Sequence, residues 1–177
     1  RGGGGRYNDP PPADAEVEFG VQQVKLLGAL SRYPNVPGQL MVRVDAPCLS
    51  EAHEPPLETR AVSPGGSGMA AIRFDWTHFV PLSRGDRAWE RLGLALGDTR
   101  RGSSSADVSF VLRDSKRDRT LGQATLSLRE VLDSGTERPA QTLRIVDASG
   151  TAVAEAMVTV RALDALREVE RTELGGG

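Results

Sequence analysis

Apolar and polar residues alternate with a period of two through most of the chain. In a β-strand, successive side chains point to opposite faces, so this alternation is typical of strands with one buried face. Eight segments show it: residues 17–26, 40–45, 72–76, 92–96, 108–113, 124–128, 143–145 and 154–160. A weaker segment spans 57–62. In the first segment the parity shifts between Val21 and Val24, which indicates a β-bulge. The segment 92–96 rests on Leu92, Leu94 and Leu96, preceded by Trp89.

Short turn signals separate most of these segments. Residues 33–38, 63–66, 101–103 and 147–150 are rich in Gly, Pro, Asn, Asp and Ser. Connections this short favour antiparallel neighbours, and strands with one polar face pack as two facing sheets. The pattern therefore predicts an all-β fold, an eight-stranded antiparallel β-sandwich.

Helix signals are few. Residues 127–135 fit a short helix in a loop, with Gly135 near its C-terminal end. Leu163, Leu166 and Val169 are spaced among charged residues as on one face of a short C-terminal helix.

The two ends of the chain differ in composition from its middle. The chain opens with Arg1 and four glycines, continues through three consecutive prolines, and closes with three glycines. Glycine and proline runs do not build a packed core. We therefore expect a flexible tail over 1–14, the sandwich over 15–163, and a short helix with a glycine tail over 164–177, as one module of a longer protein.

Composition narrows the function further. The formal net charge of −2 argues against a dedicated nucleic-acid binder, and no apolar run approaches the ~20 residues that cross a bilayer. A single cysteine, Cys48, excludes an internal disulfide and a multi-thiolate metal site, and it favours a reducing, intracellular compartment. His53 and His78 are too few and too far apart for a metal motif, so we expect no metal and no cofactor.

The second half of the chain resembles a C2 domain. Residues 108–114 form a strand that ends in an acidic loop, and residues 121–128 form a strand that opens with Leu121-Gly122 before alternating. A closer resemblance is to the C-terminal C2 domain of the RPGR-interacting-protein family. It is carried by the turn at 128–135, the strands at 143–146 and 156–160, and the aromatic strand at 72–80. The similarity covers about 15–169 and is thin before Met69.

Members of that family are scaffolds of the ciliary transition zone, and their C2 domain of this type binds the β-propeller of the retinitis pigmentosa GTPase regulator. The resemblance implies a C2-type β-sandwich that is not an enzyme and binds another ciliary protein. It also implies a location at the transition zone, basal body or centriole. A centriolar or ciliary C2 protein that self-assembles is a further alternative.

The residues themselves argue against calcium. Ca²⁺ takes 6–8 oxygen ligands, which C2 domains supply as carboxylates from two loops at one end. The first such loop, 31–38, contains no Asp or Glu. In the second, 114–120, Asp114 matches the first acidic position, but Lys116 and Arg119 stand where two further carboxylates are expected. We therefore predict no calcium site, with Asp114 and Asp118 solvated or paired locally.

Two groups of residues are candidates for binding. The first is a basic loop of Arg113, Lys116, Arg117 and Arg119, placed near Arg100 and Arg101, which could contact anionic lipid or an acidic partner. A solvated loop balanced by its own acidic residues is the favoured interpretation. The second is aromatic: Tyr33 is the better interface candidate, because the pattern places Trp76 and Trp89 in the core. A sheet edge could also accept a partner strand, but the sequence does not say which edge.

No catalytic constellation is visible. The chain lacks a phosphate-binding glycine loop and a nucleophile elbow. His78 shares its parity with Trp76 and is interpreted as a core or edge residue, and Cys48 as a small, partly buried one. Ser103-Ser104-Ser105 follows Arg100-Arg101-Gly102, which is compatible with phosphorylation, although a solvated loop is the favoured interpretation.

Overall fold

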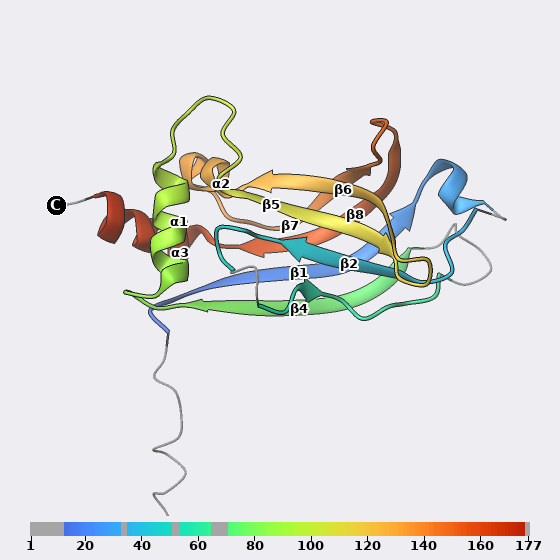
Figure 1. The fold of residues 1–177 in the computed structure, drawn as a ribbon, viewed down its shortest axis with the longest axis horizontal. Coiled ribbons are helices and arrows are strands. Elements are labelled where there is room, and N and C mark those ends of the chain that lie inside the picture. The colour runs from blue at the N-terminus through green and yellow to red at the C-terminus, as the bar shows by residue number, and fades with distance from the viewer. Residues whose placement is uncertain (1–12, 33–34, 51–53, 65–70, 176–177) are drawn as a thin grey trace, which may run out of the picture.

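The computed structural model describes residues 13–32, 35–50, 54–64 and 71–175. Its eight strands, shown in Figure 1, are β1 (Ala15–Leu26), β2 (Leu40–Asp45), β3 (Leu57–Glu58), β4 (Ile72–Leu82), β5 (Asp107–Asp114), β6 (Arg119–Ser127), β7 (Arg138–Val146) and β8 (Ala152–Arg161). Its helices are the short 3-10 helix η2 (Gly28–Ser31), α1 (Arg87–Gly97), α2 (Leu128–Ser134), α3 (Leu163–Val169) and the π-helical turn η3 (Glu170–Leu174).

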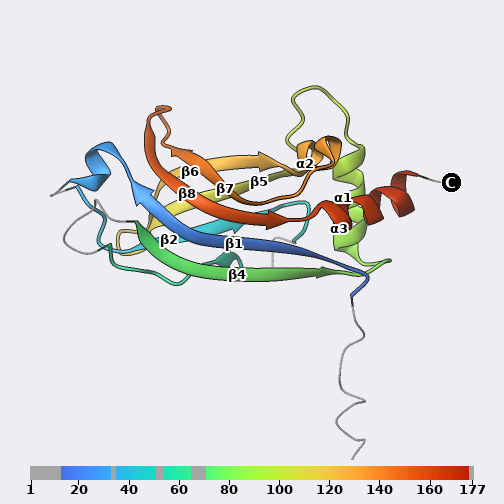
Figure 2. The same ribbon diagram turned by 180° about the vertical axis from the view of Figure 1, so that it is seen from behind.

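The strands are all antiparallel and run in the order β3-β2-β5-β6-β7-β8-β1-β4. Strands β6 and β7 share a single register pair, Gln123 with Val146, so the hydrogen-bonded ladder nearly breaks there. The chain thus forms two four-stranded halves, which Figures 1 and 2 show from opposite sides. The predicted eight-stranded antiparallel sandwich is confirmed, with β3 and β4 as its edge strands.

Gly122 allows the two halves to meet. A Cβ at this position would lie 2.7 Å from the carbonyl oxygen of Val146 and 2.9 Å from Cγ2 of Ile145. Only glycine leaves room for the backbone of β7 to approach β6 this closely.

The core lies between the two halves and contains the residues that alternation predicts. Phe19 and Val21 of β1 face inward, as do Phe110 and Leu112 of β5, and all four are fully buried. The predicted bulge is present, because the β1 register shifts between Val21 and Gln23.

The strand predicted at 92–96 is wrong: these residues belong to helix α1. Trp89, Leu92 and Leu96 are buried, whereas Leu94 is 78% exposed. Spacings of three and seven residues put the first three on one helical face and leave Leu94 on the other. The weaker segment at 57–62 supplies the missing strand, as β3 and an isolated bridge between Val62 and Leu40.

The two predicted short helices are confirmed. Helix α2 begins after Ser127, whose hydroxyl accepts a hydrogen bond from the Glu130 amide, and it ends at Gly135 with a φ of +64°. Helix α3 buries Leu163, Leu166 and Val169, as their spacing predicts.

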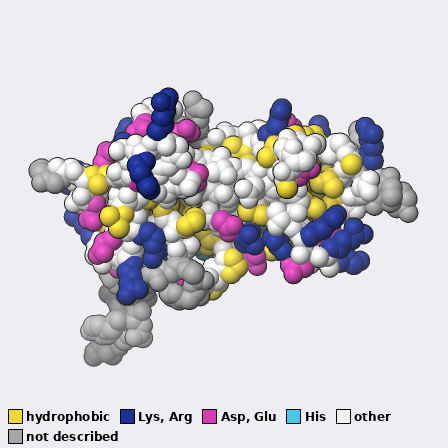
Figure 3. Space-filling model, turned by 45° about the horizontal axis from the view of Figure 1, so that its top comes forward, with side chains coloured by type: hydrophobic (Ala, Val, Ile, Leu, Met, Phe, Trp, Pro, Cys, Tyr) yellow, Lys and Arg dark blue, Asp and Glu magenta, His cyan; other side chains and the backbone are white. Residues whose placement is uncertain are grey.

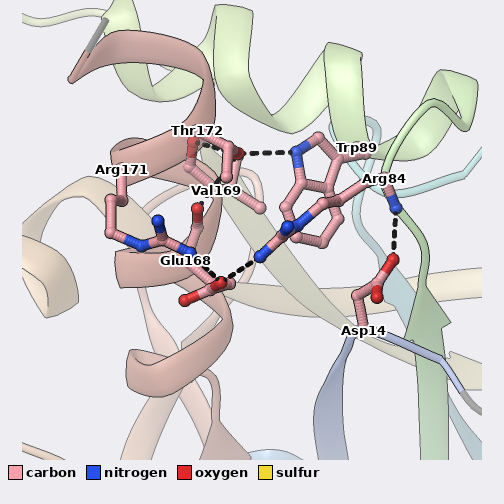
Figure 4. A network of polar contacts seen from close by, with 7 residues as sticks. All are labelled: Asp14, Arg84, Trp89, Glu168, Val169, Arg171 and Thr172. Atoms are coloured by element: carbon pink, nitrogen blue, oxygen red, sulfur yellow. Dashed lines mark hydrogen bonds and ion pairs between the residues drawn. The ribbon is translucent and has the colours of Figure 1, made fainter. Parts of the chain in front are cut away.

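The C-terminal helices close one end of the sandwich against α1. Figure 4 shows the indole Nε1–H of Trp89 donating to Oγ1 of Thr172 at 3.0 Å. Glu168 accepts from Arg84 at 2.5 Å and also pairs with Arg171, and the Arg84 amide donates to Asp14 at 2.8 Å. These contacts join the start of β1, the end of β4 and helix α3 at the same end. Within the described residues, no helix has the length and apolar character needed to cross a bilayer.

Candidate functional site

The turn between β5 and β6 folds around a buried aspartate. Asp114 is fully buried, and its Oδ1 accepts hydrogen bonds from the backbone amides of Lys116 at 3.1 Å and Arg117 at 3.3 Å. The Ser115 amide donates to the Gln39 carbonyl at 3.0 Å, which holds the turn against the segment before β2. Asp114 therefore organises the turn from inside, and the expectation that it is solvated in the loop is wrong.

The predicted basic loop is this turn, and its cations differ in freedom. The Arg113 side chain is only 18% exposed, and its guanidinium donates to Asp118 at 2.6 Å and to the Thr120 hydroxyl at 2.9 Å. The side chains of Lys116, Arg117 and Arg119 are exposed. Figure 3 shows Lys and Arg side chains gathering at this end of the molecule. The predicted local pairing of Asp118 is confirmed, and three cations remain directed to solvent.

Arg100 and Arg101 do not lie near this turn, contrary to the expectation. They belong to the loop between α1 and β5, whereas the basic turn follows β5. The eight residues of β5 separate the two groups by roughly 25 Å. Figure 1 shows the two loops at opposite ends of the strand. Arg100 pairs with Asp98 at 2.8 Å, and Arg101 is exposed. Tyr33, the remaining predicted contact, lies outside the described residues.

The edge strand β4 carries aromatic side chains that are half-buried or exposed: Trp76, His78 and Phe79. The rings of Trp76 and His78 stack with centroids 6.0 Å apart and planes 9° from parallel. Trp76 is half-buried and packs against the core, so its core interpretation is confirmed in part, whereas His78 is exposed on this edge strand. Phe79, on the opposite face of the strand, is 49% exposed. Trp89, by contrast, is buried as predicted.

Phe79 is a functional candidate that sequence reasoning missed. It follows the alternating run and pairs in register with Glu18 of β1, so it points away from the core. The signal was its opposite parity to Phe74 and Trp76.

The described residues form no cluster of three His, Cys, Asp or Glu side chains that could hold a metal ion. Cys48 is buried, and this burial raises the pKa of its thiol to about 11, so it is a poor nucleophile.

Comparison with known proteins identifies the fold. No protein-family model matches the chain, and no curated protein matches it by sequence. Solved structures do match. The structure of CC2D1B has a TM-score of 0.56 and 18% identity, covering 96% of this chain and 72% of that one. A C2 domain of plant extended synaptotagmin 1 has a TM-score of 0.51 and 13% identity, covering 85% of this chain and 95% of that one.

A C2 domain-containing protein from a putative elicitor-responsive gene has a TM-score of 0.50 and 13% identity, covering 86% of this chain and 90% of that one. The architecture is therefore that of the C2 fold. At these identities the likeness concerns the fold alone.

Proposed function

We propose that this chain is a C2-type module that binds another protein without calcium, through the open side of strand β4. The observation that carries the proposal is this strand. It is an eleven-residue edge strand, paired only with β1 among the described strands, and it presents Phe79 and the Trp76–His78 stack. Partner proteins add a strand to such edges, and aromatic side chains are favoured anchors at interfaces.

The basic turn supports calcium independence. The Asp114 carboxylate is buried on two backbone amides, and Asp118 is paired with Arg113. Oδ1 of Asp114 and the Asp118 carboxylate are thus engaged within the turn, while Oδ2 of Asp114 is buried without a hydrogen-bond partner among the described residues. The exposed cations Lys116, Arg117 and Arg119 would repel a divalent ion.

The resemblance to the RPGR-interacting-protein family suggests the partner. The proposed partner is a ciliary protein of the transition zone, basal body or centriole. The first candidate is the β-propeller of the retinitis pigmentosa GTPase regulator. The structural neighbours support the C2 fold on which this proposal rests.

Titration calorimetry of the chain against the purified propeller tests this proposal. We expect a 1:1 complex whose affinity is the same in calcium and in a chelator. Phe79→Asp should weaken binding by about tenfold or more, because it replaces an exposed aromatic anchor with a charge. The matched control is Leu94→Asp, at an exposed apolar residue of α1, which should bind as the unmodified chain does.

Each outcome is informative. A propeller that does not bind rules out the named partner. Equal binding by Phe79→Asp removes β4 as the surface, and binding only in calcium contradicts the interpretation of the basic turn.

A second candidate function is docking on anionic membranes through the basic turn. The exposure of Lys116, Arg117 and Arg119 favours it, since each cation near an anionic surface contributes about 1 kcal/mol. Co-sedimentation with phosphatidylserine vesicles at low and physiological salt tests it. Lipid docking predicts pelleting that fades with salt. It also predicts loss of pelleting when the three residues become Ala, but not when Arg100 and Arg101 do.

A further inference from the structure

The loop between α1 and β5, residues 98–106, stands away from the body of the sandwich (Figure 1). It contains the sequence Arg100-Arg101-Gly102-Ser103-Ser104. Arg100 is 82% exposed, and Arg101 and Gly102 are also exposed. Gly102 has a φ of +76°, and a Cβ there would meet nothing within 4 Å. The tip of the loop is thus free of packing.

Serine or threonine three residues after an arginine is the pattern that basophilic protein kinases read, because acidic residues in their clefts bind the cation. The chain has four such hydroxyls: Ser63, Ser103, Ser104 and Thr120. Only Ser103 has arginines both two and three residues before it.

The four hydroxyls differ in how readily the structure could present them to a kinase. Kinases bind their substrates as extended, unpaired chain. Thr120 lies in β6, in register with Arg113, and its hydroxyl accepts from that side chain at 2.9 Å. Ser63 precedes Pro64, which restricts the backbone of Ser63. The arginine three residues before it, Arg60, is already engaged, because its guanidinium donates to the Phe74 carbonyl at 3.3 Å. Ser103 and Ser104 lie in a loop without strand pairing.

The Asp98 carboxylate and a few bonds within the loop hold Ser103 in place. The Ser103 amide donates to the Arg100 carbonyl at 3.0 Å, and the Ser105 amide donates to the Ser103 hydroxyl at 3.3 Å. The Ser103 hydroxyl donates to Oδ2 of Asp98 at 2.7 Å, and Ser105 donates to the same oxygen at 2.5 Å. Arg100 makes two further bonds to this carboxylate, each of 2.8 Å. A loop held by one carboxylate and a few local bonds, with no strand pairing, can open into a kinase cleft at a smaller cost than a paired strand.

We propose that Ser103 is a phosphorylation site for a basophilic protein kinase, independent of the partner of β4. The γ-phosphoryl group of ATP passes to Oγ of Ser103. The new Oγ–P bond forms as the bond from the γ-phosphorus to the bridging oxygen breaks. ADP leaves with that oxygen, and the hydroxyl proton goes to the kinase's catalytic base.

Phosphorylation would rebuild the loop. The phosphate brings a charge of about −1.5 to −2 next to the Asp98 carboxylate, which repels it. Arg100 can then pair with the phosphate instead of Asp98. Arg129 of α2 lines the same surface cleft of about 400 Å³ as Ser103 and Arg100, so a second cation lies within that cleft. Ser105 and Asp98 lose the geometry that closes the loop, and its amides become more exposed.

The test is phosphorylation of the whole chain by cyclic-AMP-dependent protein kinase with ATP, with the site mapped by fragment mass spectrometry. We expect one phosphate, on Ser103. Ser103→Ala should lose it, whereas the matched control Ser104→Ala should be phosphorylated as fast as the unmodified chain. Arg101→Ala should lower kcat/KM about tenfold, the effect of one lost charge-assisted contact with the kinase.

A phosphate on Ser63, Ser104 or Thr120 instead, or none, overturns the proposal. Circular dichroism of the variants shows that they are folded, so that a lost phosphate reports the site. Hydrogen exchange of the phosphorylated chain tests the rebuilding: faster exchange over 99–106 is expected, and unchanged exchange contradicts it.

Discussion

The two ends of strand β5 each fold a loop around one aspartate, but with different donors. At the β5–β6 turn, Asp114 is fully buried and accepts from the backbone amides of Lys116 and Arg117. At the α1–β5 loop, Asp98 is 14% exposed and accepts mainly from the side chains of Arg100, Ser103 and Ser105. The same carboxylate chemistry thus builds two kinds of loop.

The difference decides which end can change. Backbone amides are present whatever side chain the sequence carries, so the Asp114 turn has a fixed shape. Hydroxyl and guanidinium donors can be modified or can exchange partners, so the Asp98 loop can be rebuilt by a phosphate. Hydrogen bonds from Arg100, Ser105 and Ser103 hold the pKa of Asp98 well below its usual range, so the carboxylate is charged at neutral pH.

The largest expected effect tests how rigid the Asp114 end is. Gly122→Ala places a Cβ 2.7 Å from the Val146 carbonyl oxygen, and this backbone contact cannot swing aside. We expect a loss of about 3 kcal/mol in the free energy of unfolding, the upper range for overpacking. Urea unfolding followed by circular dichroism measures it.

The matched control for this substitution is Gly38→Ala. Its Cβ would lie 3.1 Å from Cδ of Lys116, in the middle of a flexible and exposed side chain that can move. It should therefore change the stability much less. Equal effects of the two substitutions would show that the joint between β6 and β7 is not tight.

The next effect concerns Asp114 itself. Asp114→Ala leaves the amides of Lys116 and Arg117 without their acceptor, and we expect a loss of about 2 kcal/mol in the free energy of unfolding. Asp118→Asn is the control, because Asp118 is almost fully exposed, its pair with Arg113 lies at the surface, and Asn tolerates its φ of +51°. An Asp114→Ala chain as stable as the control would contradict a structural role for this carboxylate.

The sequence predicts an element correctly where its apolar residues fit either the strand period or the helical period, but not both. Phe110 and Leu112 alternate cleanly, and their strand is confirmed. Leu92, Leu94 and Leu96 alternate too, yet they lie in helix α1, because Trp89, Leu92 and Leu96 also satisfy the helical period. Only the exposure of Leu94 separates the two interpretations, and exposure is a tertiary property.

The candidate site is less predictable, because long-range pairing sets it. The exposure of Lys116, Arg117 and Arg119 is consistent with a polar turn, but the burial of Asp114 depends on packing against the segment before β2. The outward direction of Phe79 follows from its parity, but the order of the strands decides that β4 is an edge strand. Whether any of these residues binds lipid or a partner stays a prediction.

A smaller effect concerns the pH dependence of the contribution that Asp98 makes to stability. Because the pKa of Asp98 is lower in the folded chain than in the unfolded one, its stabilisation is present at neutral pH. It is lost as the pH falls below the unfolded value of about 3.9 toward the folded one. We expect the free energy of unfolding of the unmodified chain, relative to Asp98→Asn, to be constant near neutral pH and to shrink below about pH 4. A difference independent of pH would contradict the charge-assisted network.

The smallest effect uses Cys48 as a reporter of the Asp98 end. Cys48 lines a surface hollow together with Asp98, Leu94 and Ser105, so the loop lies beside the thiol. Burial raises the pKa of this thiol from 9.0 to about 11, which lowers its thiolate fraction at pH 8 by about a hundredfold. The native chain should therefore react slowly with a thiol-specific disulfide reagent. Asp98→Ala should speed the reaction by loosening the loop, whereas Asp114→Ala, at the far end of β5, should not. If both variants react at the same rate, the Asp98 loop does not cover this thiol independently of the rest of the fold, and the contrast between the two ends is lost.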